Sequence, residues 1–246
     1  MLKYRPVTIA LSVILAGQAA NANAQESPWR FQLTPYIWMA GLSGDMRPLE
    51  NAPTISTSRS FSEVLDDLDG AFFMAGSARR DRLVLFGDIT WASLSHEGAL
   101  PPGIAAEGKL RQRSVTAAAG YQVVSTPSQH LDLLAGARAW RLEAEVNVSA
   151  LGVSASETER WVDPILAARL RSTWTPRWST LVHADIGGFG IGSDNTWQAV
   201  ATANYQISDT LHLSAGYRHL AVDRDESGTR IDVTMSGPLL GATWRF

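Results

Sequence analysis

Strict alternation of apolar and polar residues is the dominant pattern of this chain, and it recurs from residue 29 to the C-terminus. In segment 131–139, Leu131, Leu133 and three alanines alternate with polar residues that include Asp132 and Arg138. Successive side chains of a strand point to opposite faces, so this pattern predicts a β-strand with one apolar and one polar face. Further segments of this kind are 29–42, 83–95, 109–124, 162–171, 178–186, 197–207, 211–218 and 230–246.

A tenth segment, 71–79, is apolar at both parities, because Phe72, Phe73 and Met74 follow one another. Its facing is therefore ambiguous. We include it because a barrel whose chain enters and leaves on the same side needs an even number of strands. The pattern predicts ten strands, with eight as the alternative if the weaker segments belong to loops.

The position of charged residues separates a membrane barrel from a soluble sheet. The apolar faces carry no charge through their middle portions, where one would cost about 2–4 kcal/mol at the bilayer midplane. A soluble sheet also alternates, but its strands usually have about 5–6 residues. These segments match the roughly 9–11 residues that a tilted strand needs to cross hydrocarbon. The fold class predicted is all-β: a closed, antiparallel, up-and-down transmembrane β-barrel.

The connections between these segments alternate in length. Gaps 43–70, 96–108, 149–157, 190–195 and 224–229 are long and polar, whereas those near residues 81, 127, 175 and 209 are short turns. Long loops on one side and tight turns on the other are typical of outer-membrane barrels. The first loop contains Ser60 three residues before Glu63, a capping-box spacing that predicts a short helix. This helix either covers the mouth of the barrel or decorates its surface, and we expect the second.

The first residues describe an export signal. Lys3 and Arg5 precede an apolar run of about 11 residues, and Ala22 and Ala24 form a small-residue cleavage site. We expect residues 1–24 to be a cleaved signal peptide and residues 25–246 to be the barrel domain. Cleavage leaves a net charge of about −5, which argues against nucleic acid as a partner. Cysteine is absent, so no disulfide framework is expected.

Aromatic residues fall near the predicted strand ends, where they would form two girdles at the membrane interfaces. The turn-side set is Trp29, Tyr121, Trp174, Trp178, Tyr205, Trp244 and Phe246, and the loop-side set is Trp91, Trp161, Trp197 and Tyr217. Three tryptophans, Trp38, Trp140 and Trp161, are candidates to point inward instead.

With these features the chain resembles the small Gram-negative outer-membrane β-barrel superfamily, over residues 29–246. The resemblance depends on the signal peptide, the alternating strands, Gly216-Tyr217-Arg218 and the terminal Trp-Arg-Phe. Segments 29–38 and 237–246 resemble, more narrowly, a group of uncharacterised outer-membrane barrels. The resemblance implies location in the cell outer membrane and recognition of Trp244 and Phe246, as an assembly signature, by the barrel-assembly machinery. Outer-membrane lipid and lipopolysaccharide are the other expected partners.

The inner face predicts a network of buried charges, because arginine pairs bidentately with carboxylates in confined spaces. We expect Arg138, Arg169, Arg171 and Arg218 to pair with Asp88, Asp163, Asp185 and Asp232 in some combination. The predicted interior network is Arg30, Asp88, Arg138, Asp163, Arg169, Arg171, His183, Asp185, Arg218 and Asp232. A barrel of this size filled with such side chains is nearly occluded, or holds a narrow wet pore.

Two functions follow as hypotheses. The first is a non-enzymatic barrel, with a structural or surface-interaction role or as a narrow channel for small polar solutes. The alternative is a membrane-embedded hydrolase or acyltransferase that uses the inward His183 and Asp185, although a satisfied interior network is favoured for this pair. No metal site or cofactor is predicted, and the small strand number favours a monomer. The glycines at 187–192 do not fit a dinucleotide fingerprint and predict a tight bend at the rim.

The last strand has an irregular pattern. Its apolar residues occupy odd positions at Ile231, Val233 and Met235, then even positions from Pro238 to Phe246. We expect a β-bulge at Gly237-Pro238 that restores the facing of the strand.

Overall fold

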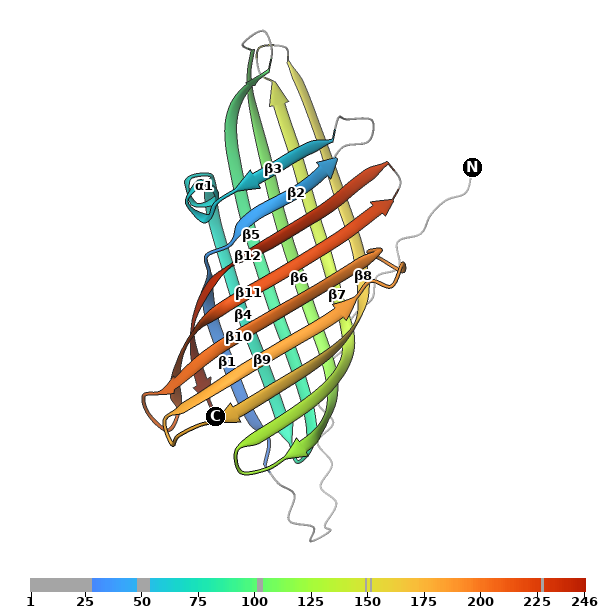
Figure 1. Ribbon diagram of the computed structural model, residues 1–246. Coiled ribbons are helices and arrows are strands. Elements are labelled where there is room, and N and C mark those ends of the chain that lie inside the picture. The colour runs from blue at the N-terminus through green and yellow to red at the C-terminus, as the bar shows by residue number, and fades with distance from the viewer. Residues whose placement is uncertain (1–27, 48–53, 101–103, 149, 151, 227) are drawn as a thin grey trace, which may run out of the picture.

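The computed structural model describes residues 28–47, 54–100, 104–148, 150, 152–226 and 228–246 (Figure 1). The predicted signal peptide lies outside these residues. Among the described residues, no helix is long and apolar enough to cross a membrane.

Ten antiparallel strands close into a barrel, as the alternation predicts (Figure 1). The strands are β1 (Arg30–Trp38), β4 (Leu68–Arg80), β5 (Leu83–Leu100), β6 (Ile104–Ser125), β7 (Gln129–Val148), β8 (Val153–Thr173), β9 (Trp178–Gly187), β10 (Asn195–Gln206), β11 (Leu211–Glu226) and β12 (Thr229–Arg245). Neighbours along the chain pair with one another, and β1 closes the ring by pairing with both β4 and β12. The uncertain tenth segment is thus strand β4, with Phe73 inside and Phe72 largely exposed.

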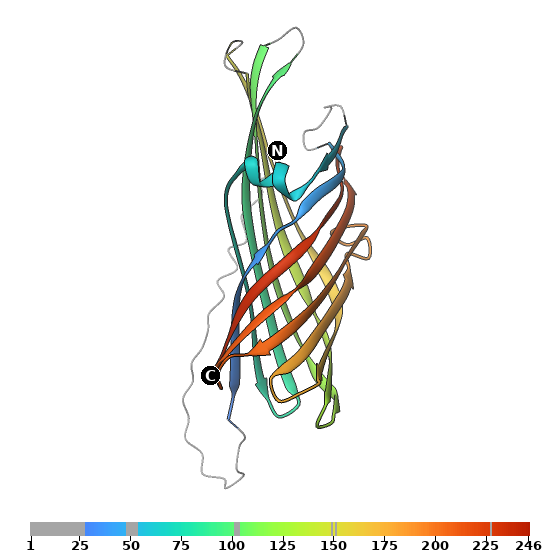
Figure 2. The ribbon, with the colours of Figure 1, turned by 60° about the vertical axis from the view of Figure 1, so that its left-hand side comes forward.

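Two further strands and a helix occupy the predicted first loop. They are β2 (Gly41–Arg47), β3 (Ile55–Arg59) and α1 (Phe61–Asp66). β2 continues the line of β1 along β12 after a break at residues 39–40, and β3 pairs with β2. Helix α1 then connects β3 to β4, and Figure 2 shows it beside the β2–β3 hairpin at the upper part of the barrel wall.

The tight turns lie where the sequence predicts them, whereas the long outer loops are largely strand. Strands β5 and β6 continue as a hairpin to Leu100 and Ile104, and β7 and β8 continue to Val148 and Val153. These four strands rise well beyond their neighbours (Figure 1). Because the outer face of this extension is polar, the prediction assigned it to loops.

Polarity reverses with height along the barrel. On β7 the outward residues run from Leu133 through alanines 135, 137 and 139 to Arg141 and Glu143, while the inward residues change from Arg138 to Leu142 and Ala144. In the lower half the outward side chains must match hydrocarbon. In the upper half they meet water, so the apolar residues turn to the interior.

The same reversal explains the last strand. β12 pairs with β11 from Leu211–Trp244 to Glu226–Thr229 in a single register. The predicted bulge at Gly237-Pro238 is therefore wrong. Ile231, Val233 and Met235 face inward in the upper half, whereas Leu240 and Trp244 face lipid in the lower half. Gly237 instead allows the backbone of β12 to approach the β1–β2 break closely, because a Cβ there would lie 1.9 Å from the carbonyl oxygen of Met39.

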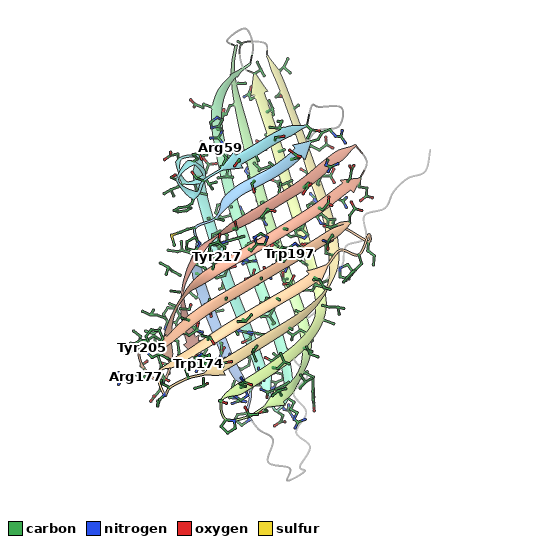
Figure 3. All side chains as sticks on the ribbon, in the orientation of Figure 1. Arg59, Trp174, Arg177, Trp197, Tyr205 and Tyr217 are labelled. Atoms are coloured by element: carbon green, nitrogen blue, oxygen red, sulfur yellow. The ribbon has the colours of Figure 1, made fainter. Side chains whose placement is uncertain are left out.

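Aromatic side chains mark the two edges of the apolar band (Figure 3). Trp174 and Tyr205 lie at the turn end, where Arg177 donates a hydrogen bond to Tyr205 (3.3 Å), and Trp197 and Tyr217 lie further up the outer face. This arrangement agrees with two interfacial girdles. Trp38, Trp140 and Trp161 are buried in the interior, as predicted for these three.

A row of three exposed or half-exposed arginines lies above the band. Arg141 of β7 lies directly opposite Arg113 of β6 and Arg160 of β8. Like charges in directly opposed positions destabilise a sheet. Glu143, on the same outer face, pairs with Arg141 (2.5 Å between Nε and Oε1) and offsets part of this repulsion.

Candidate functional site

The barrel interior has three levels: a cavity near the turns, a polar layer at mid-height and an apolar cavity above it. We define the polar layer by its two buried ion pairs, Arg138–Asp185 and Arg218–Asp88. Strand alternation places these side chains in the lumen from β7, β9, β11 and β5.

In the first pair, Arg138 donates through Nη2 to both carboxylate oxygens of Asp185, at 2.9 Å each. The two side chains are 1% and 0% exposed, so water does not screen the pair. Asp185 also bonds Nε2 of His183 (3.0 Å) and accepts from the amide of Gln198, while Arg138 Nε donates to Thr116 (3.1 Å). These bonds support the buried pair, although Arg138 Nη1, His183 Nδ1 and Gln198 Oε1 have no hydrogen-bond partner among the described residues.

In the second pair, Arg218 Nη2 lies 3.3 Å from Oδ1 of Asp88. The hydroxyl of Tyr36 donates to Asp88 Oδ2 at 2.8 Å and accepts from Arg218. The Arg218 guanidinium also lies over the ring of Trp38, 4.6 Å from its centre. Both pairings fall among those expected from the sequence, but the role of Tyr36 was not anticipated.

Asp163 has a different environment from the one predicted, since none of its described partners is an arginine. Its carboxylate is fully buried and accepts from the indole nitrogens of Trp140 (2.8 Å) and Trp161 (3.3 Å). It also accepts from the backbone N–H (2.6 Å) and hydroxyl (3.0 Å) of Ser193. Asp163 therefore fastens the β9–β10 loop to the inside of the barrel wall.

That loop contains the predicted tight bend at the rim. Gly188 and Gly190 have φ of 84° and 71°, and Phe189 between them has φ of 52°. Gly192 lies so close to β8 that a Cβ would be 2.6 Å from Oδ1 of Asp163. The bend returns the chain into the lumen, where Ser193 is fully buried.

The other predicted network residues lie apart from the polar layer. Arg169 and Arg171 face the lumen nearer the turns, where Arg169 lies over Phe86 and Arg171 bonds Gln32. Arg30 is exposed at the turn end. Asp232 lies on the outer face of the upper half, 3.6 Å from Arg230, because the single register of β12 turns even residues outward.

Above the polar layer lies the apolar cavity, which we call the outer cavity. Its volume is about 130 Å³, against roughly 10–15 Å³ for one water. Trp38, Phe73, Trp140, Trp161, Ile231 and Val233 form much of its wall. The rings of Trp140 and Trp161 stack with centroids 5.7 Å apart. Gln112 is the one polar side chain, apart from the tryptophan indoles, among the described residues of the wall.

Helix α1 covers this cavity, so the expectation that it only decorates the surface is wrong. Phe61, Val64 and Leu65 contribute to the cavity wall. The predicted capping box is present: Glu63 N–H donates to the Ser60 hydroxyl (3.4 Å), and Ser60 N–H donates to the Glu63 carboxylate (2.7 Å). The Ser60 hydroxyl also donates to the Glu63 carboxylate (2.7 Å), and this bond, with the one from Ser60 N–H, holds the pKa of Glu63 below its ordinary value. No residue of α1 is buried, so the helix is a thin cover.

The far end of this cover is fastened to β5. Ser95 donates its backbone N–H to the carbonyl of Asp67 (2.8 Å) and its hydroxyl to Asp69 (2.7 Å). Ser93 and Lys109 also reach Asp69, at 3.0 and 3.3 Å. The hydrogen bonds from Ser95 and Ser93 are the main reason that the pKa of Asp69 lies below its usual range. The cover is thus anchored at its ends and exposed between them.

His183 and Asp185, the residues of the hydrolase alternative, lie close together, but both are already engaged in buried contacts. His183 is 5% exposed, with its ring centre 5.2 Å from that of Phe86. Its Nε2 faces Asp185 and Gln198, and within the described chain its Nδ1 has no hydrogen-bond partner. The described residues contain no group of three or more His, Asp or Glu side chains arranged to hold a metal ion.

No protein-family model and no curated protein matches the chain. Among solved structures it is similar to the outer membrane protease OmpT from Escherichia coli, with 10% sequence identity, coverage of 93% of this chain and 99% of that chain, and a TM-score of 0.54. It is also similar to the translocator domain of the autotransporter NalP from Neisseria meningitidis, with 13% identity, coverage of 91% and 90%, and a TM-score of 0.50. These likenesses show the fold alone.

The predicted resemblance to small Gram-negative outer-membrane barrels is confirmed at the level of fold. The apolar outer band of the lower half agrees with it physically. Together they place the protein in the cell outer membrane.

The residues of the outer cavity were missed as a set by the sequence reasoning. The available signal was the odd-numbered run Ile231, Val233 and Met235 together with the three inward tryptophans. The odd-numbered run and the three tryptophans share one cause: above the membrane, the apolar side chains of the strands face the interior.

Proposed function

We propose that this protein binds a small, largely apolar molecule in the outer cavity, on the side of the membrane opposite the tight turns. The observation that supports this most strongly is the cavity itself. Protein interiors are packed to crystal-like density with few voids larger than a water molecule. A fitting ligand would bury the apolar surface of this wall, which is favourable in proportion to the area removed from water.

The chemistry of the wall defines the class of ligand. Aromatic and aliphatic side chains supply almost all of its surface, which favours an aromatic or cyclic aliphatic compound. The indole N–H of Trp38 is buried without a partner among the described residues. A ligand with a single hydrogen-bond acceptor would satisfy it.

Helix α1 and the polar layer indicate the side from which a ligand enters the outer cavity. Helix α1 is thin and exposed, and β3 is the last strand of the sheet, so the upper wall is weakest where α1 crosses it. Below, the buried ion pairs fill the lumen. Entry past α1 is therefore favoured over passage straight through, and a binding or first-stage uptake role over an open polar channel.

Binding of N-phenyl-1-naphthylamine, a neutral aromatic dye, tests this proposal through energy transfer from tryptophan in protein reconstituted in bilayer nanodiscs. We expect saturable transfer that Ala92→Phe reduces at least tenfold, because Ala92 lines the cavity. Thr158→Phe is the matched control on the exposed upper face and should bind as the wild type does. Equal, non-saturable transfer in all three proteins would contradict the proposal.

A polar channel and a hydrolase are the two alternative functions, and each predicts a different measurable activity. A narrow polar channel predicts stepwise conductance in planar bilayers, whereas the closed polar layer predicts none. A hydrolase predicts turnover of an ester substrate that is lost in His183→Ala. OmpT, with a similar fold, is named as a protease, and the NalP domain as a translocator, so the fold is compatible with either class.

A further inference from the structure

Three arginine side chains face the lumen below the polar layer and have no carboxylate partner within the described part of the chain. They are Arg169 and Arg171, two residues apart on one face of β8, and Arg245 near the end of β12. We call them the arginine cluster. All three line a cavity of about 110 Å³ beneath the polar layer. Arg171 and Arg245 also line a cavity of about 200 Å³ at the turns, so the cluster lies between the two spaces.

None of these three side chains forms an ion pair with a carboxylate among the described residues. Arg171 donates to the neutral amide oxygen of Gln32 at 3.2 Å. Arg169 lies over the Phe86 ring, 5.3 Å from its centre, and has no hydrogen-bond acceptor among the described residues. The Nε–H of Arg245 is buried and likewise has no hydrogen-bond partner among the residues that the structure describes.

Two carboxylates lie near the cluster, and each already pairs with another arginine. Asp132 lies opposite Arg169 in the β7–β8 ladder and bonds Nη2 of Arg79 through Oδ2 at 2.6 Å, while its Oδ1 has no hydrogen-bond partner among the described residues. This single negative charge is outnumbered by Arg79 and the three arginines of the cluster. Asp88, which lines the smaller cavity, forms an ion pair with Arg218. The larger cavity at the turns has no Asp or Glu among its described lining residues. The chain as a whole carries a net charge of −3, so this cluster is not part of a general basic character.

We propose that the arginine cluster binds an oxyanion, a phosphate or carboxylate group, that enters the barrel from the turn side. Like charges held close together disfavour one another, and an anion between them removes this repulsion. Guanidinium groups present paired N–H donors that match the oxygens of carboxylates and phosphates. Tight turns of outer-membrane barrels face the periplasm, so the anion comes from that compartment. This inference does not depend on the outer cavity.

Calorimetric titration with inorganic phosphate tests the site in protein purified in a neutral detergent. Sodium chloride at equal ionic strength controls for screening, and succinate tests whether a carboxylate is accepted. We expect saturable heat with phosphate, and at least a tenfold weaker affinity in Arg171→Gln. Arg59→Gln is the matched control, because Arg59 lies beside α1 at the opposite end of the barrel (Figure 3).

A second measurement separates anion binding from a purely structural role. In chloride alone, Arg171→Gln should unfold at a higher temperature than the wild type, because it removes repulsion within the cluster. Added phosphate should raise the unfolding temperature of the wild type and leave that of the variant unchanged. The proposal fails if phosphate stabilises no more than chloride, or if it stabilises both proteins equally.

Discussion

Breaking the Arg138–Asp185 pair should destabilise the barrel more than any change at its surface. Asp185→Leu leaves Arg138 at 1% exposure with Thr116 as its remaining described partner. Removing one member of a buried ion pair costs about 3–5 kcal/mol, because the other charge stays buried and uncompensated. The same substitution also removes the acceptor of His183 and Gln198.

The double variant Arg138→Leu/Asp185→Leu separates charge from shape. Replacing both members of a buried pair by apolar residues is often neutral or stabilising. We therefore expect the double variant to be more stable than Asp185→Leu but less stable than the wild type, because His183 and Gln198 lose their acceptor in both variants. Arg141→Leu is the control, because Arg141 belongs to a partly exposed pair with Glu143 for which about 0–1 kcal/mol is typical.

Urea unfolding in phospholipid vesicles, followed by tryptophan fluorescence, measures these differences. We predict that Arg141→Leu has nearly the stability of the wild type, that the double variant is less stable, and that Asp185→Leu is the least stable of the four proteins. An Asp185→Leu variant that loses no more stability than Arg141→Leu, or a double variant less stable than Asp185→Leu, would contradict this prediction.

Three further predictions concern the loop, the cover and the membrane surface. Asp163→Ala should lower unfolding free energy by about 3 kcal/mol and increase protease cleavage at the loop of Ser193. Trp140 and both donors of Ser193 lose their acceptor, whereas Trp161 keeps the Ser193 hydroxyl. Unchanged cleavage would count against this prediction. Ser60→Ala should weaken the α1 cap by about 1 kcal/mol and speed exchange of the dye between the outer cavity and the solvent. In the wild type the folded-state pKa of Glu63 is depressed, so the cap is fully formed above the ordinary pKa of Glu63 and is lost as pH falls through the lowered value. Exchange in the variant as slow as in the wild type, or wild-type exchange independent of pH, would contradict the role of α1 as a lid. Arg141→Glu should weaken lipopolysaccharide binding at least tenfold in co-purification, since Arg141 is the middle of the arginine row; equal binding would exclude that row as the contact.

The alternation of side chains predicted the barrel, its ten strands and the lipid-facing band, because in the lower half an apolar face can only be the outer one. It did not predict the upper half. There, the same alternation at Leu142 and Ala144 marks the inside, and parity alone does not reveal at which height the surroundings change from lipid to water. The apparent register switch in the last strand came from the same ambiguity at Ile231 and Pro238.

The charged interior was predictable in composition and only partly in pairing. Inward Arg138, Asp185, Arg218 and Asp88 follow from alternation within single strands. Which charges meet depends on strand stagger around the closed barrel, which no local pattern encodes. Asp163 shows this most clearly, since its position is set by tryptophans and a returning loop that brings Ser193 to it.

We expect the outer half of the barrel to hold an apolar binding cavity above the polar layer. A crystal structure of the full chain soaked with bromobenzene tests it directly through the anomalous signal of bromine. We predict a bromine peak among Trp38, Trp140 and Ile231, with the Arg138–Asp185 pair intact beneath it. A cavity filled by side chains, or bromine bound only on the lipid-facing surface, would contradict the account.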